Sequence, residues 1–447
     1  MSAAAGRTQA ERPGLLVRGA AEIATLAGGP RRGTAQADVG LLRADDGGLA
    51  LAAFEGRIVA VGRLDEVERQ LEGLAIDAAL VDSIDAEGGV VTPGLIDPHT
   101  HLLFGGSRHA EVQLRQQGHD YLAILAAGGG ILQTVRQTRA ASDEQLLGAG
   151  RRWLAEMLGH GVTTVEVKSG YGLDVEHELR LLRLAAALGE AGPIEVVPTF
   201  LGAHAVAPEF RDRPDATEAY LRHVIEAQLP AVAEQGIARA CDVFCERGVF
   251  EPDLSRRLLR AAQEHGLPVR LHADELSPSG AAELAAEVGA LTADHLGAIS
   301  DVGLTALAAA AEGATPVVAT LLPATSFYLG KPFAPARRLI EAGVPVALGS
   351  DFNPGTSPTP NMQLVLSLAM LRLELTPSEV IAAATINAAA ALGLADSHGS
   401  LEPGRHADFV VWDVDSHELL PYWLGANLVR LVVKHGRVVR TRPKMPD

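Results

Sequence analysis

Two histidines separated by a single residue, His99 and His101, stand in the stretch GLIDPHTHLLFGGSRHAE, residues 94–111. The apolar residues around them predict a β-strand, and side chains two positions apart on a strand point to the same face. Two imidazoles aimed at one point are suited to holding a metal ion. A pair of surface or structural histidines is an equally good interpretation of this motif alone, so the rest of the chain must decide.

Further candidate ligands stand at the ends of other apolar runs. His272, His295 and Asp351 close the runs PVRLHAD, LTADH and PVALGSD. Three of these four histidines together with the aspartate would suit zinc or iron and leave one coordination position open for water. Such a water ionises near neutral pH and can attack a carbonyl carbon. Asp351 could also pass a proton to a departing nitrogen, although a turn residue in GSDFNPG is its simpler interpretation.

The elements that must position these residues follow a regular alternation. From Gly161 onward, runs such as GVTTVEVKS, IEVVPTF, CDVFC and PVVATLLP alternate with Ala/Leu-rich stretches of helical period. With LIDPHTH before them, the apolar runs make eight. Eight apolar strands alternating with helices predict an α/β fold of the (β/α)₈ TIM-like barrel type, whose chemistry takes place at the carboxyl ends of the strands. The candidate ligands lie at those ends.

The two ends of the chain have a different pattern. Strand-like runs broken by Gly and Asp occur before Thr92, and similar runs return after Gly404. Each end alone is short for a β core, so we predict that both ends together build one small composite β-sandwich beside the barrel. The predicted organisation is a disordered tail at residues 1–12, a sandwich of residues 13–92 and 404–447, and a barrel of residues 93–403.

The composition is that of a globular protein, with 47% hydrophobic and 21% charged residues. The net charge of −17 and the lack of long Lys/Arg runs argue against nucleic acid or an anionic membrane as a partner. No apolar segment predicts a signal peptide or a membrane span. Cys241 and Cys245 lack the spacing of a metal or redox motif, so we expect reduced packing residues in a cytoplasmic protein.

Longer motifs resemble those of a known enzyme family. The segments PGLIDPHTH, LHADE, ADHL and GSDFNPG resemble the amidohydrolase superfamily, whose members are metal-dependent hydrolases on a (β/α)₈ barrel with a composite β-sandwich. Finer motifs, among them FGGSRHAE, VEVKSGYGL, TFLGAH and GSDFNPGTSPTPNM, are similar to those of the imidazolonepropionase family within it. The similarity extends from about residue 14 to about residue 440.

The resemblance implies a ring opening in histidine degradation, in which water adds to the lactam carbonyl of 4-imidazolone-5-propanoate and gives N-formimidoyl-L-glutamate. It also implies one zinc or iron ion per subunit and a homodimer. The metal would be held by His99, His101, His272 and Asp351. The catalytic groups would be Glu275, His295 and Asp351, and the substrate-binding residues Arg108, Tyr171, His204, Glu275, Asn353, Gly355 and Thr356.

The chemistry of these residues agrees with such roles, and each has a simpler alternative. Arg108, in a Gly-rich loop, offers the planar fork that a propionate carboxylate requires, but it could be a solvated loop residue. Tyr171 and His204 could be packing residues. Glu275 could accept the ring N–H or orient water, or be only a first-turn helix carboxylate. The resemblance suggests that His295 bonds a metal-bound water or the developing oxyanion rather than the metal.

Other hypotheses are left open by the sequence. A different cyclic amidohydrolase or an amidine deaminase would share the metal ligands without needing Arg108 and Tyr171. A catalytically silent barrel would have lost the ligands. Some amidohydrolases bridge two metals with a carboxylated lysine on the fourth strand, whereas Lys168 ends the second predicted strand, so we expect one metal and a structural Lys168. Neither the choice between zinc and iron nor the first proton acceptor follows from the sequence.

Overall fold

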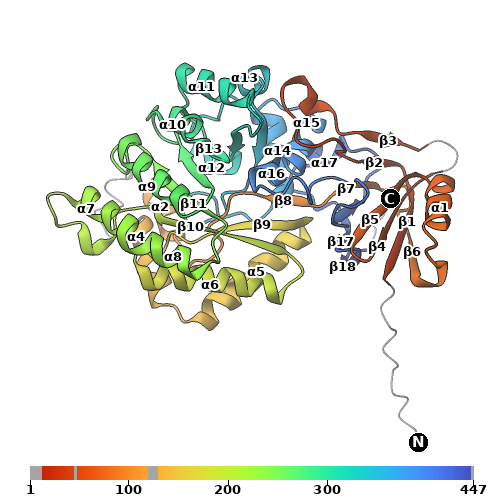
Figure 1. The fold of residues 1–447 in the computed structure, drawn as a ribbon, viewed down its shortest axis with the longest axis horizontal. Coiled ribbons are helices and arrows are strands. Elements are labelled where there is room, and N and C mark those ends of the chain that lie inside the picture. The colour runs from red at the N-terminus through yellow and green to blue at the C-terminus, as the bar shows by residue number, and fades with distance from the viewer. Residues whose placement is uncertain (1–12, 45–47, 119–128, 444–447) are drawn as a thin grey trace, which may run out of the picture.

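The computed structural model describes residues 13–44, 48–118 and 129–443. The predicted disordered tail at residues 1–12 lies outside the described residues. Within them, a barrel and a smaller pair of sheets lie side by side (Figure 1). In this part of the chain, no helix has the length and apolar character needed to span a bilayer.

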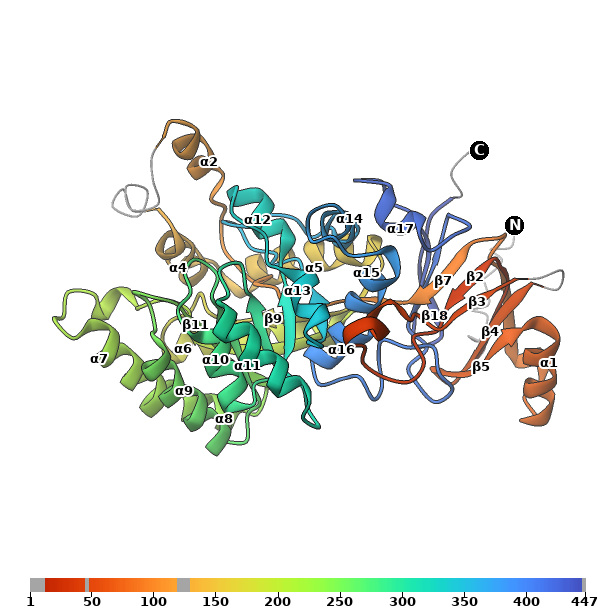
Figure 2. The same cartoon turned by 90° about the horizontal axis from the view of Figure 1, so that it is seen from above.

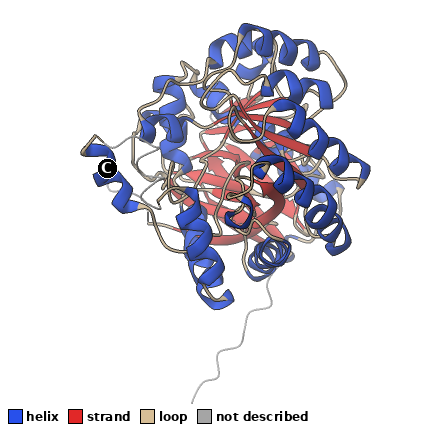
Figure 3. Cartoon of the chain, turned by 90° about the vertical axis from the view of Figure 1, so that its left-hand side faces the viewer, coloured by secondary structure: helices blue, strands red, loops and turns tan. Residues whose placement is uncertain are grey.

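The barrel consists of eight parallel strands that lie next to one another in the order of the sequence. All eight correspond to the apolar runs of the sequence, and the predicted (β/α)₈ fold class is confirmed. Helices cover their outer face, so the strands are buried on both sides (Figure 3). The strands are β8 (Leu95–Asp97), β9 (Val162–Lys168), β10 (Glu195–Ala203), β11 (Ala240–Cys245), β12 (Val269–Ala273), β13 (Thr292–His295), β14 (Val318–Leu321) and β15 (Val346–Leu348).

Helices connect the barrel strands, and several of them are amphipathic with an apolar side turned inward. In α9 (Pro252–Glu264), for example, Pro252 starts the helix, and Leu258, Leu259 and Ala262 are buried on one side. The others are α2 (His109–Gln116), α4 (Ile131–Ala140), α5 (Asp143–Gly159), α6 (Val175–Ala191), α7 (Ala216–His223), α8 (Leu229–Gln235), α10 (Ala281–Val288), α11 (Asp301–Ala311), α12 (Pro323–Leu329), α13 (Ala336–Glu341), α14 (Met362–Arg372), α15 (Pro377–Ala383) and α16 (Ile386–Ala391).

Both ends of the chain build a two-sheet sandwich beside the barrel (Figure 2). Its core contains Val17 and Leu51 from one sheet and Phe409, Val411 and Val433 from the other. One sheet has the order β5 (Arg57–Arg63), β4 (Leu49–Phe54), β1 (Gly14–Ala20) and β6 (Val81–Asp85), with α1 (Leu64–Gly73) packed on it. The other has the order β18 (Arg437–Thr441), β17 (Val429–Lys434), β16 (Phe409–Trp412), β7 (Val90–Pro93), β2 (Glu22–Ala24) and β3 (Leu41–Arg43), and α17 (Leu419–Tyr422) precedes β17 in the chain.

The barrel closes between its first and last strands, β8 and β15, by an unusual set of contacts. Gln36, in the short helix η1 (Gly33–Ala37), donates from its side chain to the carbonyl of Val346 at 3.1 Å and accepts from the Val346 N–H at 3.1 Å. The Asn387 amide donates to the same carbonyl at 2.9 Å. Nearer the carboxyl ends, Asp97 accepts from the Ser350 N–H at 2.9 Å. Side chains therefore satisfy the strand edges that lack a ladder.

We predict that Gln36→Ala destabilises the barrel, because Gln36 bonds the amino-terminal residue of β15 at the seam. The substitution leaves the buried Val346 N–H without its partner, and we expect the free energy of unfolding to fall by about 1–3 kcal/mol. Denaturant unfolding of both proteins measures this. Gln235→Ala is the control, since Gln235 is only partly buried and donates to the Leu179 carbonyl at 2.9 Å, and it should lose less. Equal stability of Gln36→Ala and the wild type would contradict this account of the seam.

Candidate metal centre and active site

Histidines from several strands meet at the carboxyl end of the barrel. The sequence predicted a strand that reaches His101. Strand β8 instead ends at Asp97, so His99 and His101 lie just beyond it. Thr100 nevertheless forms a parallel bridge with Phe352, which keeps the segment extended. Both imidazoles consequently come together with Asp351 in a group able to hold a metal ion.

Three distances between donor atoms of the four predicted ligands are close to those of a coordination shell, although the four are spread over three overlapping groups of possible ligands among the described residues. Nε2 of His101 lies 3.3 Å from Nε2 of His272. Oδ1 of Asp351 lies 3.5 Å from Nε2 of His101 and 3.7 Å from Nε2 of His99. Tetrahedral ligands about 2.0–2.1 Å from zinc stand about 3.3–3.4 Å apart. These residues therefore fit a metal ion.

Burial supports the same conclusion. The side chains of His99, His101, His272 and Asp351 are almost completely buried, and Nε2 of His99 has no hydrogen-bond partner among the described residues. Buried polar atoms rarely lack a partner, and a bound cation would satisfy this one. His204 and His295 extend the cluster, because His101, His204 and His272 form a second possible metal group and His99, His272 and His295 a third.

Carboxylates behind the imidazoles fix their orientation. Oδ2 of Asp294 lies 2.7 Å from Nδ1 of His99, and Oδ2 of Asp242 lies 3.1 Å from Nδ1 of His272. A carboxylate at Nδ1 favours the tautomer whose Nε2 lone pair is free for a ligand bond. Sequence reasoning missed the part of Asp294, although its place directly before His295 at a strand end was a usable signal.

A buried lysine lies beneath this layer. Nζ of Lys168 is 2.7 Å from Oδ2 of Asp242 and 2.8 Å from Oε2 of Glu166. Burial disfavours its charged form, but Asp242 and Glu166 outweigh that effect and raise the pKa of Lys168. The ammonium charge therefore belongs to an ion-pair network in the barrel interior, which agrees with the structural role expected for Lys168.

Burial keeps His99 and His101 neutral and makes Asp351 and Glu275 hard to ionise, whereas at His272 burial is outweighed by Asp242, which raises the pKa of His272. Burial, together with the nearby Lys168 and the other imidazoles, lowers the pKa of His99 and that of His101 well below the usual value. Burial raises the pKa of Asp351 to about 6, and burial together with the charge of Asp351 raises the pKa of Glu275 to about 8. Neutral imidazoles are the form that binds metals, and a bound cation would favour ionised carboxylates.

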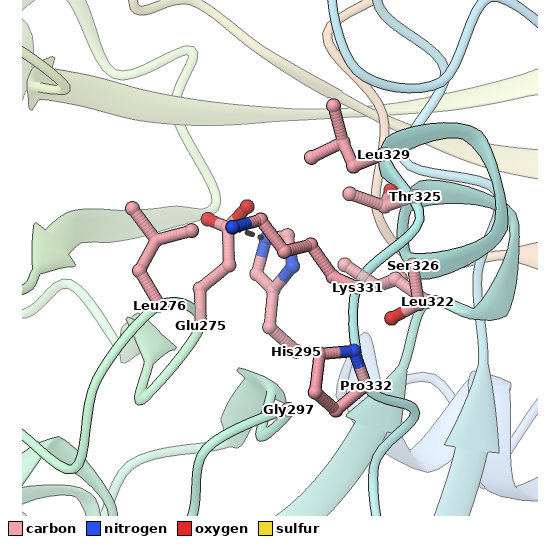
Figure 4. A pocket seen from close by; sticks show the side chains of 10 residues that line it. All are labelled: Glu275, Leu276, His295, Gly297, Leu322, Thr325, Ser326, Leu329, Lys331 and Pro332. Atoms are coloured by element: carbon pink, nitrogen blue, oxygen red, sulfur yellow. Dashed lines mark ion pairs between the residues drawn. The ribbon is translucent and has the colours of Figure 1, made fainter. Parts of the chain in front are cut away.

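A pocket opens beside the metal group (Figure 4). Glu275 and His295 line it, with Oε2 of Glu275 3.7 Å from Nε2 of His295. Thr325, which also lines it, donates to Oδ2 of Asp351 at 2.6 Å. Lys331 is a further lining residue, and it belongs to an exposed segment after α12. Sequence reasoning missed Thr325 and Lys331, because the loop after the seventh strand contains no histidine or carboxylate that marks a site.

Two of the predicted substrate-binding residues stack against the histidine cluster. The ring of His204 lies parallel to that of His101 at 4.8 Å between centroids, and the ring of Tyr171 lies 5.4 Å from that of His204. Nδ1 of His204 is 3.0 Å from the carbonyl oxygen of Gly170 and thus placed to donate to it. Gly170 has a φ of +78° and would clash with His204 if it carried a side chain. Glycine is therefore required where this loop approaches the site.

The remaining predicted residues form a turn that follows Asp351. Oδ1 of Asn353 accepts from the N–H groups of Gly355 and Thr356, both at 2.8 Å, so its amide holds the turn together. The guanidinium of Arg108 lies directly against Gly355, where any side chain would collide with it. The structure thus brings every predicted site residue to one end of the barrel. Direct contact of Asn353, Gly355 and Thr356 with a ligand stays a prediction.

Sequence comparisons place the whole chain among known hydrolases. The amidohydrolase family matches residues 90–439. An imidazolonepropionase of Symbiobacterium thermophilum is 51% identical over 427 residues, which cover 95% of this chain and 97% of that protein. One of Geobacillus kaustophilus is 49% identical over 428 residues, again 95% of this chain and 97% of the relative.

Solved structures with lower identity share the fold. A variant of an atrazine chlorohydrolase from Arthrobacter aurescens, complexed with zinc and atraton, has a TM-score of 0.69 at 18% identity, covering 97% of each chain. An adenosine deaminase of Xanthomonas campestris with bound zinc has a TM-score of 0.67 at 19% identity, covering 97% of this chain and 94% of that one. From the full-length sequence matches, this chain belongs to the amidohydrolase family, within its imidazolonepropionase branch.

Proposed function

We propose that this protein is an imidazolonepropionase that hydrolyses the lactam C–N bond of 4-imidazolone-5-propanoate to N-formimidoyl-L-glutamate. The observation that carries the proposal is the position of Arg108 and Tyr171 beside the histidine cluster, in a chain about half identical to imidazolonepropionases over nearly its full length. An amidine deaminase would use the same metal ligands but would not need a cation for a propionate group. Arg108 provides that cation.

Within the proposal, His99, His101, His272 and Asp351 hold one zinc or iron ion. The short distances from His101 to His272 and to Asp351 support this choice, as do Asp294 and Asp242 behind two of the imidazoles. When bound, the ion would supply an acidified water and polarise the lactam carbonyl. His204 and His295 are then left for the substrate.

The side chains around the pocket would bind the substrate and move its protons. Arg108 would pair with the propionate carboxylate, and Tyr171 would donate to the ligand, since burial raises the pKa of its hydroxyl and keeps it protonated. His295 would stabilise negative charge on the carbonyl oxygen from its Nε2. Glu275 would bond the ring N–H or orient the attacking water, and Asp351 would carry a proton to the departing nitrogen.

The function is tested by the ultraviolet absorbance decay of freshly prepared 4-imidazolone-5-propanoate. We expect rapid decay with the purified protein, loss of this activity after chelation, and recovery with zinc or iron. Spontaneous substrate decay, measured without protein, is subtracted. A protein that contains metal yet leaves the decay at background would contradict the proposed substrate.

We predict that His272→Ala abolishes metal binding while His265→Ala does not. His272 is buried with its Nε2 3.3 Å from Nε2 of His101, whereas His265 is exposed at the end of α9. Metal content by elemental analysis should fall from about one ion per chain to near zero only in His272→Ala. Activity should fall by at least about 10²-fold in the same variant. Full metal occupancy in His272→Ala would remove this residue from the ligand set.

The raised pKa of Glu275 predicts a pH-dependent stability of the chelated protein. The folded protein holds a proton on Glu275 up to about pH 8, whereas the unfolded chain releases it near pH 4.5, so stability falls as the pH rises through this window. Glu275→Gln cannot lose that proton. We therefore compare the thermal unfolding midpoints of chelated Glu275→Gln and chelated wild type. The difference between them, variant minus wild type, should rise from pH 5 to pH 8 and stay constant at higher pH. A difference that is constant with pH would contradict the buried, protonated state.

A further inference from the structure

The guanidinium of Arg108 is held by a buried glutamate that has no assigned role. Nε of Arg108 donates to Oε1 of Glu111 at 3.0 Å, and Nη2 donates to Oε2 at 2.9 Å. Both side chains are largely buried, with 10% and 7% of their surface exposed. This two-pronged pair is the strong and directional form of an arginine–carboxylate contact.

Glu111 also joins two helices. Arg108 is the residue before α2, Glu111 lies in its first turn, and Oε1 of Glu111 accepts a third bond from the N–H of Gly130 at 2.7 Å. Gly130 caps the start of α4, whose Thr138 hydroxyl in turn accepts from the Gly105 N–H at 2.9 Å. The segment that carries Arg108 is thus bonded to both the start and the last turn of α4.

The paired edge of the guanidinium faces Glu111, and Nη1 lies against Gly355. Gly355 belongs to the turn held by Asn353, directly after Asp351. One edge of the group is therefore fixed to the scaffold, while Nη1 lies against the turn that is predicted to bind the substrate. Burial opposes ionisation of Glu111, but the bonds from Arg108 and Gly130 outweigh it and lower its pKa, so the pair stays charged.

We propose that Glu111 is a positioning residue for the substrate carboxylate, acting through Arg108. A free arginine side chain would lose its rotamer freedom when the substrate binds, whereas Glu111 removes that freedom beforehand. This inference rests on the proposed function, because it takes a carboxylate-bearing substrate to be the ligand of Arg108.

The control is a second arginine–glutamate fork elsewhere in the chain, whose glutamate is equally buried and whose arginine is 33% exposed. Glu379 in α15 accepts from Arg337 at 2.9 and 2.6 Å and from the Thr376 N–H at 2.8 Å, and only 5% of its side chain is exposed. It therefore reproduces the contacts of Glu111 without a place in the site. Glu379→Ala reports the loss of stability caused by breaking such a fork.

With 4-imidazolone-5-propanoate as substrate, we expect Glu111→Ala to raise KM by about tenfold or more with kcat changed by less than about threefold. Glu111→Gln keeps one acceptor oxygen, so its KM should lie between those of the wild type and of Glu111→Ala. Glu379→Ala should lower the melting temperature as Glu111→Ala does and leave KM unchanged. A KM of Glu111→Ala within twofold of the wild type would overturn the inference.

A double-mutant cycle separates this inference from the proposed function. If Glu111 acts through Arg108, the double variant Arg108→Ala/Glu111→Ala should have the KM of Arg108→Ala alone. Additive effects of the two substitutions would overturn the positioning role while leaving Arg108 as the substrate ligand. An unchanged KM in Arg108→Ala itself would overturn the role of Arg108 in the proposed function and the inference with it.

Discussion

The site depends on how the barrel closes between its first and last strands. Two backbone hydrogen bonds cross this seam just above the strand ends, from Asp351 N–H to the His99 carbonyl at 3.0 Å and from His101 N–H to the Phe352 carbonyl at 2.9 Å. They hold the two histidines that follow the first strand against the aspartate that follows the last. The ligand atoms that bind a metal must be placed to within a few tenths of an ångström. The contacts that close the barrel therefore also assemble the ligand set.

Below the ligands, charged groups stabilise one another inside the barrel. Lys168, with Asp242 and Glu166, forms ion pairs in a region without solvent exposure, and Arg270 approaches Glu166 at 3.3 Å. Buried charges are costly unless they are paired and hydrogen-bonded. Here the pairing keeps Asp242 ionised behind His272. The ion pairs thus offset the cost of burying these charges and hold Asp242 against His272. The orientation of that imidazole is fixed as a result, as metal binding requires.

Much of this architecture could be predicted from local pattern. The eight barrel strands follow from apolar runs alternating with helical periods, and the candidate ligands follow from histidines placed where those runs end. The predicted strand through His101 was too long, since β8 ends at Asp97 directly before Pro98, which has no N–H to donate to the ladder. Lys168 lies at the end of the second strand, as its position in the sequence indicated.

The parts that could not be predicted depend on residues distant in sequence. Asp294 meets His99 across 195 positions, and Gln36 meets Val346 across 310. The place of Asp294 before His295 at a strand end marks it as a candidate, but no local motif identifies either contact. Glu111 is close to Arg108 in the sequence, but its burial arises from α4. Thr325 becomes part of the site through its place in the pocket lining and its bond to Asp351. Such residues support the ligands rather than form them, and their types carry no chemical signature alone.

X-ray absorption at the metal edge of the purified protein tests the central claim most directly. The account predicts one ion per chain in a shell of histidine nitrogens and carboxylate oxygen at about 2.0–2.2 Å. A second metal scatterer at about 3.5–4 Å would contradict the single-metal site, because it would require a bridging group that Lys168, held in ion pairs, does not supply. A shell without histidine scattering would contradict the ligand set itself.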